Sequence, residues 1–142
     1  MAFIVRHMAT TTFRKVPYGD NLRLAKMVRA GMPASLLVEM AGRLAISPAR
    51  LAALVNIAPR TYLRRQTANA RLKPDETERA LRIGRLLHIA EEVLEDEDSA
   101  ARWFSRPLKA LGGKSPLELC ATEPGAREVE HVLGRIEHGV FA

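Results

Sequence analysis

A short polar stretch after Pro59 carries side chains that could recognise nucleic acid. Arginine binds guanine edges or phosphate with paired hydrogen bonds, and threonine binds phosphate or a thymine methyl group. On a helix that opens at Pro59, positions 60, 61, 64 and 65 share one broad face. The sequence therefore predicts a DNA-contacting surface here, and Arg64→Ala and Arg65→Ala should each weaken binding. The predicted set is Ser47, Arg60, Thr61, Tyr62, Arg64 and Arg65.

The stretch GRIEHGVFA, residues 134–142, is the second candidate binding surface. It leaves a helical pattern, turns at Gly139 and then carries Val140 and Phe141 beside charged residues. Fully burying a phenylalanine contributes about 1.5 to 3 kcal/mol, so Phe141 could anchor a contact with another protein. The alternative is that Val140 and Phe141 pack on the chain's own core after the glycine.

Catalytic and metal-binding chemistry finds little support in the sequence. The histidines at 88, 131 and 138 have no ligand partners at useful spacing, and Cys120 lies among apolar residues as a small buried hydrophobe. Gly112-Gly113-Lys114 is too short for a phosphate-cradling loop. The acidic cluster from Glu91 to Asp98 is typical of a solvated helix end, or it meets a basic partner surface. We expect no enzyme, no metal and no cofactor.

Helices must position these residues, because the chain is 47% apolar but only 5% aromatic and shows no convincing strand pattern. Ser47-Pro48 opens a short helix, residues 56–58 form a break, and Pro59 opens the next helix, which is the plan of a helix-turn-helix. Ala52 and Ala53 should allow close packing, and Leu51, Leu54, Val55 and Ile57 should anchor it. Asn56 should accept a left-handed turn, while Ala58 supplies no side-chain cap.

Further helices are predicted on both sides of this motif. One runs over 22–30 with Asn21 as its cap, and another from Pro33 carries a stripe of Leu36, Leu37, Met40 and Leu44. The longest spans about residues 74 to 95 and carries a heptad-like apolar seam. Shorter helices cover 99–104 and a capping box at Ser115–Glu118, and a last helix opens at Pro124 and ends at Gly139. The sequence thus predicts an all-α fold.

The charge is divided unevenly between the two halves of the chain. Residues 1–72 hold 12 Lys/Arg and 2 Asp/Glu, whereas residues 73–142 hold 10 and 14, which together give the net charge of +6. A basic half suits a polyanion and an acidic half suits a different partner. No apolar run approaches the ~18 to 20 residues that cross a bilayer. We therefore expect a cytoplasmic protein with no membrane partner.

Five segments, taken in order, carry a family resemblance: NIAPRTYLRR, RLKPDETERALRIGRLLHIAEEVL, AARWFSRP, LGGKSPLEL and EPGAREVEHVLGRIEHGVFA. Over about residues 31–142 the chain resembles the Xre/MbcA/ParS-like antitoxins of RES–Xre toxin–antitoxin operons. The GGKSPLEL loop and the GRIEHGV ending are the most specific parts. A helix-turn-helix alone would be weak support, because the motif is common.

The resemblance implies an Xre-type helix-turn-helix bundle, a long connecting helix and a small helical toxin-binding domain. The expected divisions are an arm with a short helix at 1–32, the DNA-binding region at 33–73, the connecting or dimerisation helix at 74–97 and the toxin-binding domain at 98–142. The partner would be a RES-type toxin that consumes NAD, and the antitoxin would cover its active site and repress its own operon as a dimer. The implied toxin-binding set is Lys114, Arg135, Glu137, His138, Gly139, Val140, Phe141 and Ala142.

The alternative is a stand-alone dimeric helix-turn-helix transcriptional regulator whose C-terminal domain serves oligomerisation. A neighbouring toxin gene would favour the antitoxin, and its absence would favour the lone regulator.

Overall fold

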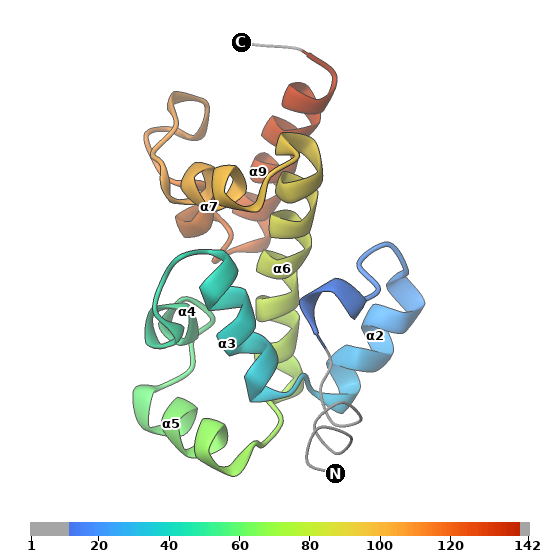
Figure 1. The fold of residues 1–142 in the computed structure, drawn as a ribbon, viewed down its shortest axis with the longest axis vertical. Coiled ribbons are helices and arrows are strands. Elements are labelled where there is room, and N and C mark those ends of the chain that lie inside the picture. The colour runs from blue at the N-terminus through green and yellow to red at the C-terminus, as the bar shows by residue number, and fades with distance from the viewer. Residues whose placement is uncertain (1–11, 140–142) are drawn as a thin grey trace. The chain divides into compact units, whose positions relative to one another are not determined.

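The computed structural model describes residues 12–139, and over this range the regular elements are all helical. The only extended pairings in this range are two isolated antiparallel bridges, so the predicted all-α class is confirmed. The elements, followed in chain order in Figure 1, are η1 (Phe13–Lys15), α2 (Asn21–Ala30), α3 (Ala34–Arg43), α4 (Pro48–Leu54), α5 (Pro59–Ala68), α6 (Pro74–Leu94), α7 (Glu97–Ser105), η2 (Lys109–Leu111), α8 (Pro116–Leu119) and α9 (Glu123–Glu137).

The described chain divides into two compact units, and α6 runs through the boundary between them. The first unit holds the chain up to Gly42 together with Ser47–Glu78. The second holds the chain from Arg79 onward and also the tetrapeptide Arg43–Ile46.

The core of the first unit is built on α3. Its apolar residues recur every three or four positions, so one face of the helix is buried, as the stripe of Leu36, Leu37 and Met40 predicts. The start of α6 is fastened to the residues before α3, because the Met32 N–H donates to the Thr77 hydroxyl at 3.0 Å. Leu72 also donates its N–H to the Met32 carbonyl at 2.8 Å. These bonds fix where the chain passes from α5 to α6.

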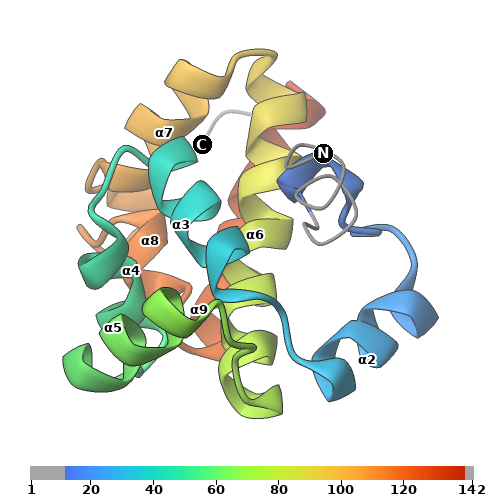
Figure 2. The ribbon, with the colours of Figure 1, turned by 60° about the horizontal axis from the view of Figure 1, so that its bottom comes forward.

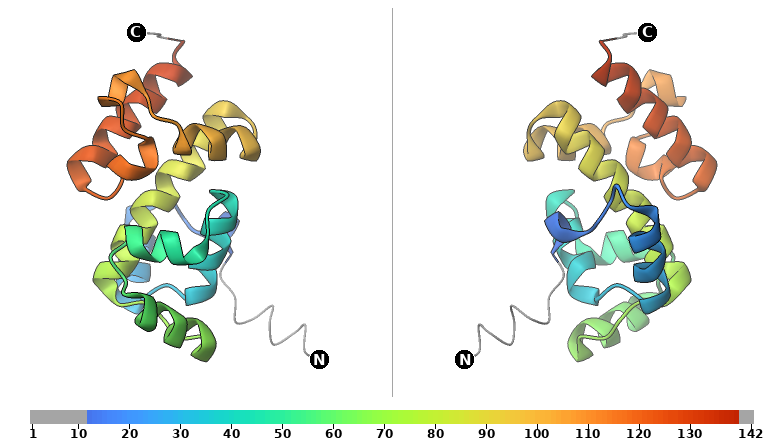
Figure 3. Two further views of the ribbon diagram at one scale, coloured as in Figure 1. Left: turned by 90° about the vertical axis from the view of Figure 1, so that its left-hand side faces the viewer. Right: turned by 90° about the vertical axis from the view of Figure 1, so that its right-hand side faces the viewer.

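The second unit is organised around the short helix α8, which packs against both α7 and α9 (Figure 3). The predicted capping box at its start is confirmed: Ser115 accepts from the Glu118 N–H, and the Glu118 carboxylate accepts from the Ser115 N–H. Helix α9 buries one face on this unit, and its buried residues are Gly125, Ala126, Val129, Val132 and Leu133.

Two predicted helix caps, at the start of α2 and at the end of α9, shift by one residue. Asp20, rather than Asn21, caps α2 by accepting from the Arg23 N–H. Helix α5 ends at Ala68, because Asn69 takes a left-handed conformation at φ 51°. The cap of α9 is His138, and Gly139 follows it at φ 71°, the left-handed position that glycine adopts without strain.

The apolar seam predicted along α6 is buried within the chain itself. Ala80, Ile83, Leu87 and Ala90 are all buried, while Leu94 is half-buried. The seam is therefore not an open surface for pairing with a second copy. Among the described residues no helix combines the length and apolar character that crossing a bilayer requires.

Candidate functional site

Helices α4 and α5 form the predicted helix-turn-helix and lie side by side in Figure 2. Ser47 caps α4 by accepting from the Arg50 N–H at 3.1 Å, and Pro48 fills the first helical position. The chain then turns at Asn56, whose φ of 63° is the left-handed value that the sequence predicts. The Ile57 N–H donates to the Ala52 carbonyl at 2.8 Å, which closes the turn.

The anchor between the two helices is largely as predicted. Leu51, Ala52, Val55 and Ile57 are buried, so the small side chain at 52 does face the packing surface. Leu54 is half-buried, whereas Ala53 is exposed, so the expectation that Ala53 faces the packing surface was wrong. Ala58 precedes α5 without a side-chain cap, as expected.

The outward face of α5 carries cations with no acidic partner. Arg60 and Arg64 are exposed and Thr61 is half-exposed. Arg50 on α4 is also exposed. Among the residues that the structure describes, no carboxylate pairs with these three arginines. Open guanidinium groups on the second helix of such a motif suit contacts with DNA phosphates and base edges.

Two members of the predicted DNA-contacting set face inward instead. Tyr62 is buried, and burial raises the pKa of its hydroxyl. Arg65 is only 9% exposed and donates a hydrogen bond to the Glu76 carboxylate, which is 7% exposed. The two positions are three residues apart and so lie on the same inward stripe of α5. The expectation that position 65 shares the outward face was wrong.

Glu76 explains why an arginine is buried at this place. It stands at the third position of α6, and its carboxylate also accepts from the Lys73 N–H at 2.8 Å. A buried carboxylate is costly unless it is paired, and Arg65 supplies the opposite charge. An acidic residue in the first turn of a helix that follows closely on α5 was the sequence signal for this pair.

The members of the predicted toxin-binding set within the described range lie in two places, the loop before α8 and the end of α9. Lys114 is exposed on the loop between η2 and α8, where its carbonyl accepts from the Leu108 N–H at 3.0 Å. Arg135 is half-exposed on α9, and Glu137, His138 and Gly139 are exposed at its end. The Glu137 carboxylate lies 3.9 Å from the His138 ring. Val140, Phe141 and Ala142 lie outside the described residues.

Helix α6 contributes to the same region, which the sequence alone did not indicate. A hollow of about 280 Å³ is lined by α6 and α9 together, and its lining residues are Ile89, Glu92, Val93, Glu130, Leu133, Gly134 and Glu137. Ile89 and Val93 are apolar but lie outside the buried seam of α6, and this was the sequence signal for a second apolar surface on the helix.

Two arginines of α6, Arg82 and Arg85, are held by carboxylates of α9. Arg85 binds Glu130 through two hydrogen bonds of 3.1 Å, and this bonding lowers the Glu130 pKa. Arg82 lies 3.4 Å from a carboxylate oxygen of Glu123. These pairs tie α6 to α9 inside the unit.

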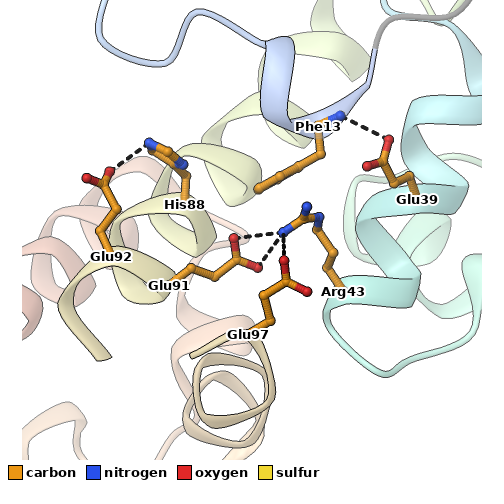
Figure 4. A network of polar contacts seen from close by, with 7 residues as sticks. All are labelled: Phe13, Glu39, Arg43, His88, Glu91, Glu92 and Glu97. Carbon is orange, nitrogen blue, oxygen red and sulfur yellow. Dashed lines mark hydrogen bonds and ion pairs between the residues drawn. The ribbon is translucent and has the colours of Figure 1, made fainter. Parts of the chain in front are cut away.

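Arg43 forms a more buried ion pair (Figure 4). Its guanidinium donates to both carboxylate oxygens of Glu91 at 2.9 and 3.0 Å and to Glu97 at 3.1 Å. The side chains of Arg43 and Glu91 are 12% and 13% exposed. Burial raises the pKa of Glu91 in spite of this cation. The acidic cluster is therefore not simply solvated, since two of its members hold Arg43.

Two of the chemical groups considered in the sequence, a metal cluster and the Cys120 thiol, can be checked in the described residues. No group of three or more His, Cys, Asp or Glu side chains among them could hold a metal ion. Cys120 is buried, and burial raises the pKa of its thiol to about 12. The thiol is therefore protonated near neutral pH, and it packs as the small hydrophobe that the sequence predicts.

Comparison with known proteins assigns both parts of the chain. Residues 23–85 match the Antitoxin Xre-like helix-turn-helix domain, and residues 90–139 match the Antitoxin Xre/MbcA/ParS C-terminal toxin-binding domain. The chain is 34% identical over 128 residues to the Antitoxin Xre of Yersinia enterocolitica, with 89% of this chain and 86% of that protein covered. The chain belongs to the Xre/MbcA/ParS antitoxin family.

Other relatives agree with this placement. The Antitoxin Xre of Photorhabdus laumondii is 29% identical over 127 residues, which cover 89% of this antitoxin and 86% of the relative. A protein of Sphingobium sp. strain YBL2, named Prs ADP-ribosylating antitoxin, is 26% identical over 125 residues, which cover 82% and 79%. The antitoxin thus combines a helix-turn-helix domain with a toxin-binding domain, and the family names describe antitoxins.

Proposed function

We propose that this antitoxin neutralises a RES-type toxin that consumes NAD by covering the toxin's active site with its C-terminal region. The observation that carries the proposal is the exposed polar end of α9, residues 137–139, inside the stretch that matches the toxin-binding domain. NAD is an anionic dinucleotide, so a pocket for it is basic and partly apolar. Glu137 followed by Val140 and Phe141 offers an acidic rim and an apolar tip for such a pocket.

The name of the Sphingobium relative supports the chemistry of the proposed toxin. That protein is called a Prs ADP-ribosylating antitoxin. ADP-ribosylation uses NAD as its donor, which agrees with a toxin that consumes NAD. We keep the predicted toxin-binding set, including Lys114, Arg135 and His138, and the predicted divisions of the chain at 32/33, 73/74 and 97/98 as part of the proposal.

Co-expression tests the neutralisation. Cells that make the toxin encoded beside this antitoxin should grow when the full chain is present and stop growing when the chain ends at Gly139. The matched control is Arg60→Ala/Arg64→Ala, which alters only the outward face of α5 and should protect fully. Full protection by the shortened chain would remove residues 140–142 from the inhibitory surface.

We further propose that the antitoxin represses its own operon as a dimer through Arg60, Thr61 and Arg64. Two copies would read half-sites about 34 Å apart, one helical turn of DNA, or a multiple of that distance. A reporter driven by the operon promoter should be repressed by the full chain and released by Arg60→Ala/Arg64→Ala. Repression that survives this double variant would remove α5 from the DNA interface.

One observation favours self-association, which the antitoxin proposal and the lone-regulator alternative both use. Helix α2 buries none of its ten residues in the chain, and Leu22 on it is 81% exposed. In analytical sedimentation the wild-type chain should behave as a dimer, and Leu22→Glu should behave as a monomer. If the wild type dimerises and represses but protects no cell from the toxin, the stand-alone dimeric regulator is the correct function.

A further inference from the structure

Gly134 lies in the interior of α9, where glycine destabilises a helix relative to alanine. The fold does not require a glycine there. A Cβ at position 134 would meet no atom within 4 Å, and Gly134 is absent from the glycines with positive φ. Gly125 near the start of the same helix differs, because a Cβ there would collide with the Leu119 carbonyl. The packing of the second unit explains Gly125 and leaves Gly134 unexplained.

Two hollows of the second unit meet at Gly134. The first lies between α6 and α9, and its apolar surface comes from Ile89, Val93 and Leu133. The second, of about 390 Å³, follows α9, and its lining is Glu130, His131, Gly134, Arg135 and His138. Glu130 and Gly134 line both hollows, so the two hollows adjoin at a position where α9 carries no side chain, and we call this place the notch at Gly134. A side chain placed at position 134 would project into it.

The edge of the first hollow is acidic. Glu92, Glu130 and Glu137 line it, and no lysine or arginine does. Glu130 is bound by Arg85. Within residues 12–139, Glu92 and Glu137 have histidine neighbours, at 2.7 and 3.9 Å, and no lysine or arginine partner. The α6 side of the notch thus combines an apolar floor with carboxylates that a cation can still reach, whereas its other side also carries His131, Arg135 and His138.

We propose that the notch at Gly134 receives a segment of the toxin that carries an apolar side chain flanked by lysine or arginine. The inference rests on the proposed function and extends the toxin contact from the end of α9 to the α6 side of the unit. Charge complementarity favours this occupant, because an apolar side chain fits the floor and the flanking cations meet Glu92 and Glu137. The hollow lies within or beside the stretch that matches the toxin-binding domain, residues 90–139.

The test uses substitutions whose effects on folding and on binding have opposite signs. Gly134→Ala should raise the melting temperature of the free antitoxin by a few degrees, because alanine is the better helix former and the Cβ meets open space. The same change should weaken binding to a purified, catalytically inactive form of the neighbouring toxin, and Gly134→Leu should weaken it at least tenfold. Loss of binding together with retained or increased stability excludes unfolding as the cause.

Gly42 provides the matched control. It lies in α3 of the first unit and is exposed, and a Cβ added there would likewise meet no atom within 4 Å. Gly42→Ala and Gly42→Leu should leave toxin affinity unchanged. Glu92→Gln/Glu137→Gln should lower toxin affinity and reduce its dependence on salt.

The possible outcomes separate this inference from the proposed function. If the wild-type antitoxin does not bind the toxin, the proposed function fails. If the wild type binds and Gly134→Leu binds equally well, the notch is not a toxin contact, while the proposed function stands. If Gly134→Leu instead abolishes self-association and leaves toxin binding intact, a second copy of this chain occupies the notch and the inference is overturned.

Discussion

The outward-facing arginines of α4 and α5 in the first unit differ from Arg43 and Arg85 of the second unit in what they bind. On α4 and α5 of the first unit, Arg50, Arg60 and Arg64 are exposed and have no acidic partner in the described part of the chain. In the second unit Arg43 and Arg85 are held by carboxylates on other elements. The open cations are available to a polyanion, whereas the paired ones connect helices within the fold.

Arg64 and Arg65 show the same contrast between adjacent residues. Arg64 faces solvent, and Arg65 is buried against Glu76. A one-residue step turns a helical side chain by about 100°, enough to move it from the outward to the inward face. Residue type alone therefore does not identify a DNA contact, and the location of the nearest carboxylate decides which role an arginine has.

The largest expected effect is the difference in unfolding free energy between Arg65→Ala and Arg64→Ala. Arg65→Ala leaves the Glu76 carboxylate buried without its cation and should lower the free energy of unfolding by about 3 to 5 kcal/mol. Arg64→Ala should change it by less than about 0.5 kcal/mol, because the side chain is exposed and unpaired. Urea unfolding of both variants measures the difference. Equal effects would show that the two arginines do not have separate roles.

A second prediction concerns Arg43, the most buried paired arginine of the second unit. Arg43→Met should cost about 3 kcal/mol at neutral pH, since Glu91 loses its cation. Burial raises the Glu91 pKa, so the folded state holds the proton more tightly than the unfolded chain. The associated stability is present below the ordinary glutamate pKa and is lost as the pH rises through the raised value.

The stability deficit of Arg43→Met should therefore shrink as the pH falls from 7 towards 4.5, the ordinary pKa of this glutamate. Urea unfolding at a series of pH values provides the measurement. Arg43→Met/Glu91→Gln is the control, and it should recover part of the loss with a weaker pH dependence. A deficit that does not vary with pH would mean that the lost contacts of Arg43, rather than the stranded charge, cause it.

Substituting the exposed, unpaired arginines should change the free energy of DNA binding, and the expected change is smaller than the two stability effects above. Arg64→Ala should weaken operator binding by about 1 to 3 kcal/mol if it reads a guanine. If it binds phosphate, the slope of log affinity against log salt should fall by about one unit. Fluorescence anisotropy at several salt concentrations distinguishes the two. Unchanged affinity for both Arg60→Ala and Arg64→Ala would contradict the assignment of α5 as the DNA-contacting helix.

The smallest effect is expected at a paired arginine that is itself exposed. Arg127 lies 3.2 Å from Glu123, one turn earlier on α9, but its side chain is 71% exposed. An exposed pair of this spacing stabilises by about 0.3 to 0.5 kcal/mol, so Arg127→Ala should stay within that range. Thermal unfolding of the variant measures it. A loss above about 1 kcal/mol would show that exposure does not discount an ion pair in this unit.

Patterns local in sequence predicted much of this fold. The Ser47-Pro48 start, the left-handed Asn56 and the capping box at Ser115 each depend on neighbours within four residues, and all three are confirmed. The apolar stripe of α3 was also predictable, because apolar residues at helical spacing indicate which face of a helix is buried.

Contacts distant in sequence were not predictable in the same way. Arg65 forms its ion pair with Glu76 only because the turn after α5 places the start of α6 beside it. The seam of α6 has the same spacing whether it meets a second copy or its own chain. The hollow at Gly134 combines residues from two helices. The sequence showed the charges and apolar faces, but their partners required the fold.

The tetrapeptide Arg43–Ile46 belongs to the same compact unit as the chain from Arg79 onward. An exchange of toxin-binding halves between two related genes at the boundary after Glu78 would therefore leave this tetrapeptide behind. The transferred half would bring Glu91 and meet whatever residue the recipient carries at position 43. An exchange that keeps this ion pair must therefore transfer positions 43 and 91 together, although they are 48 residues apart in the chain.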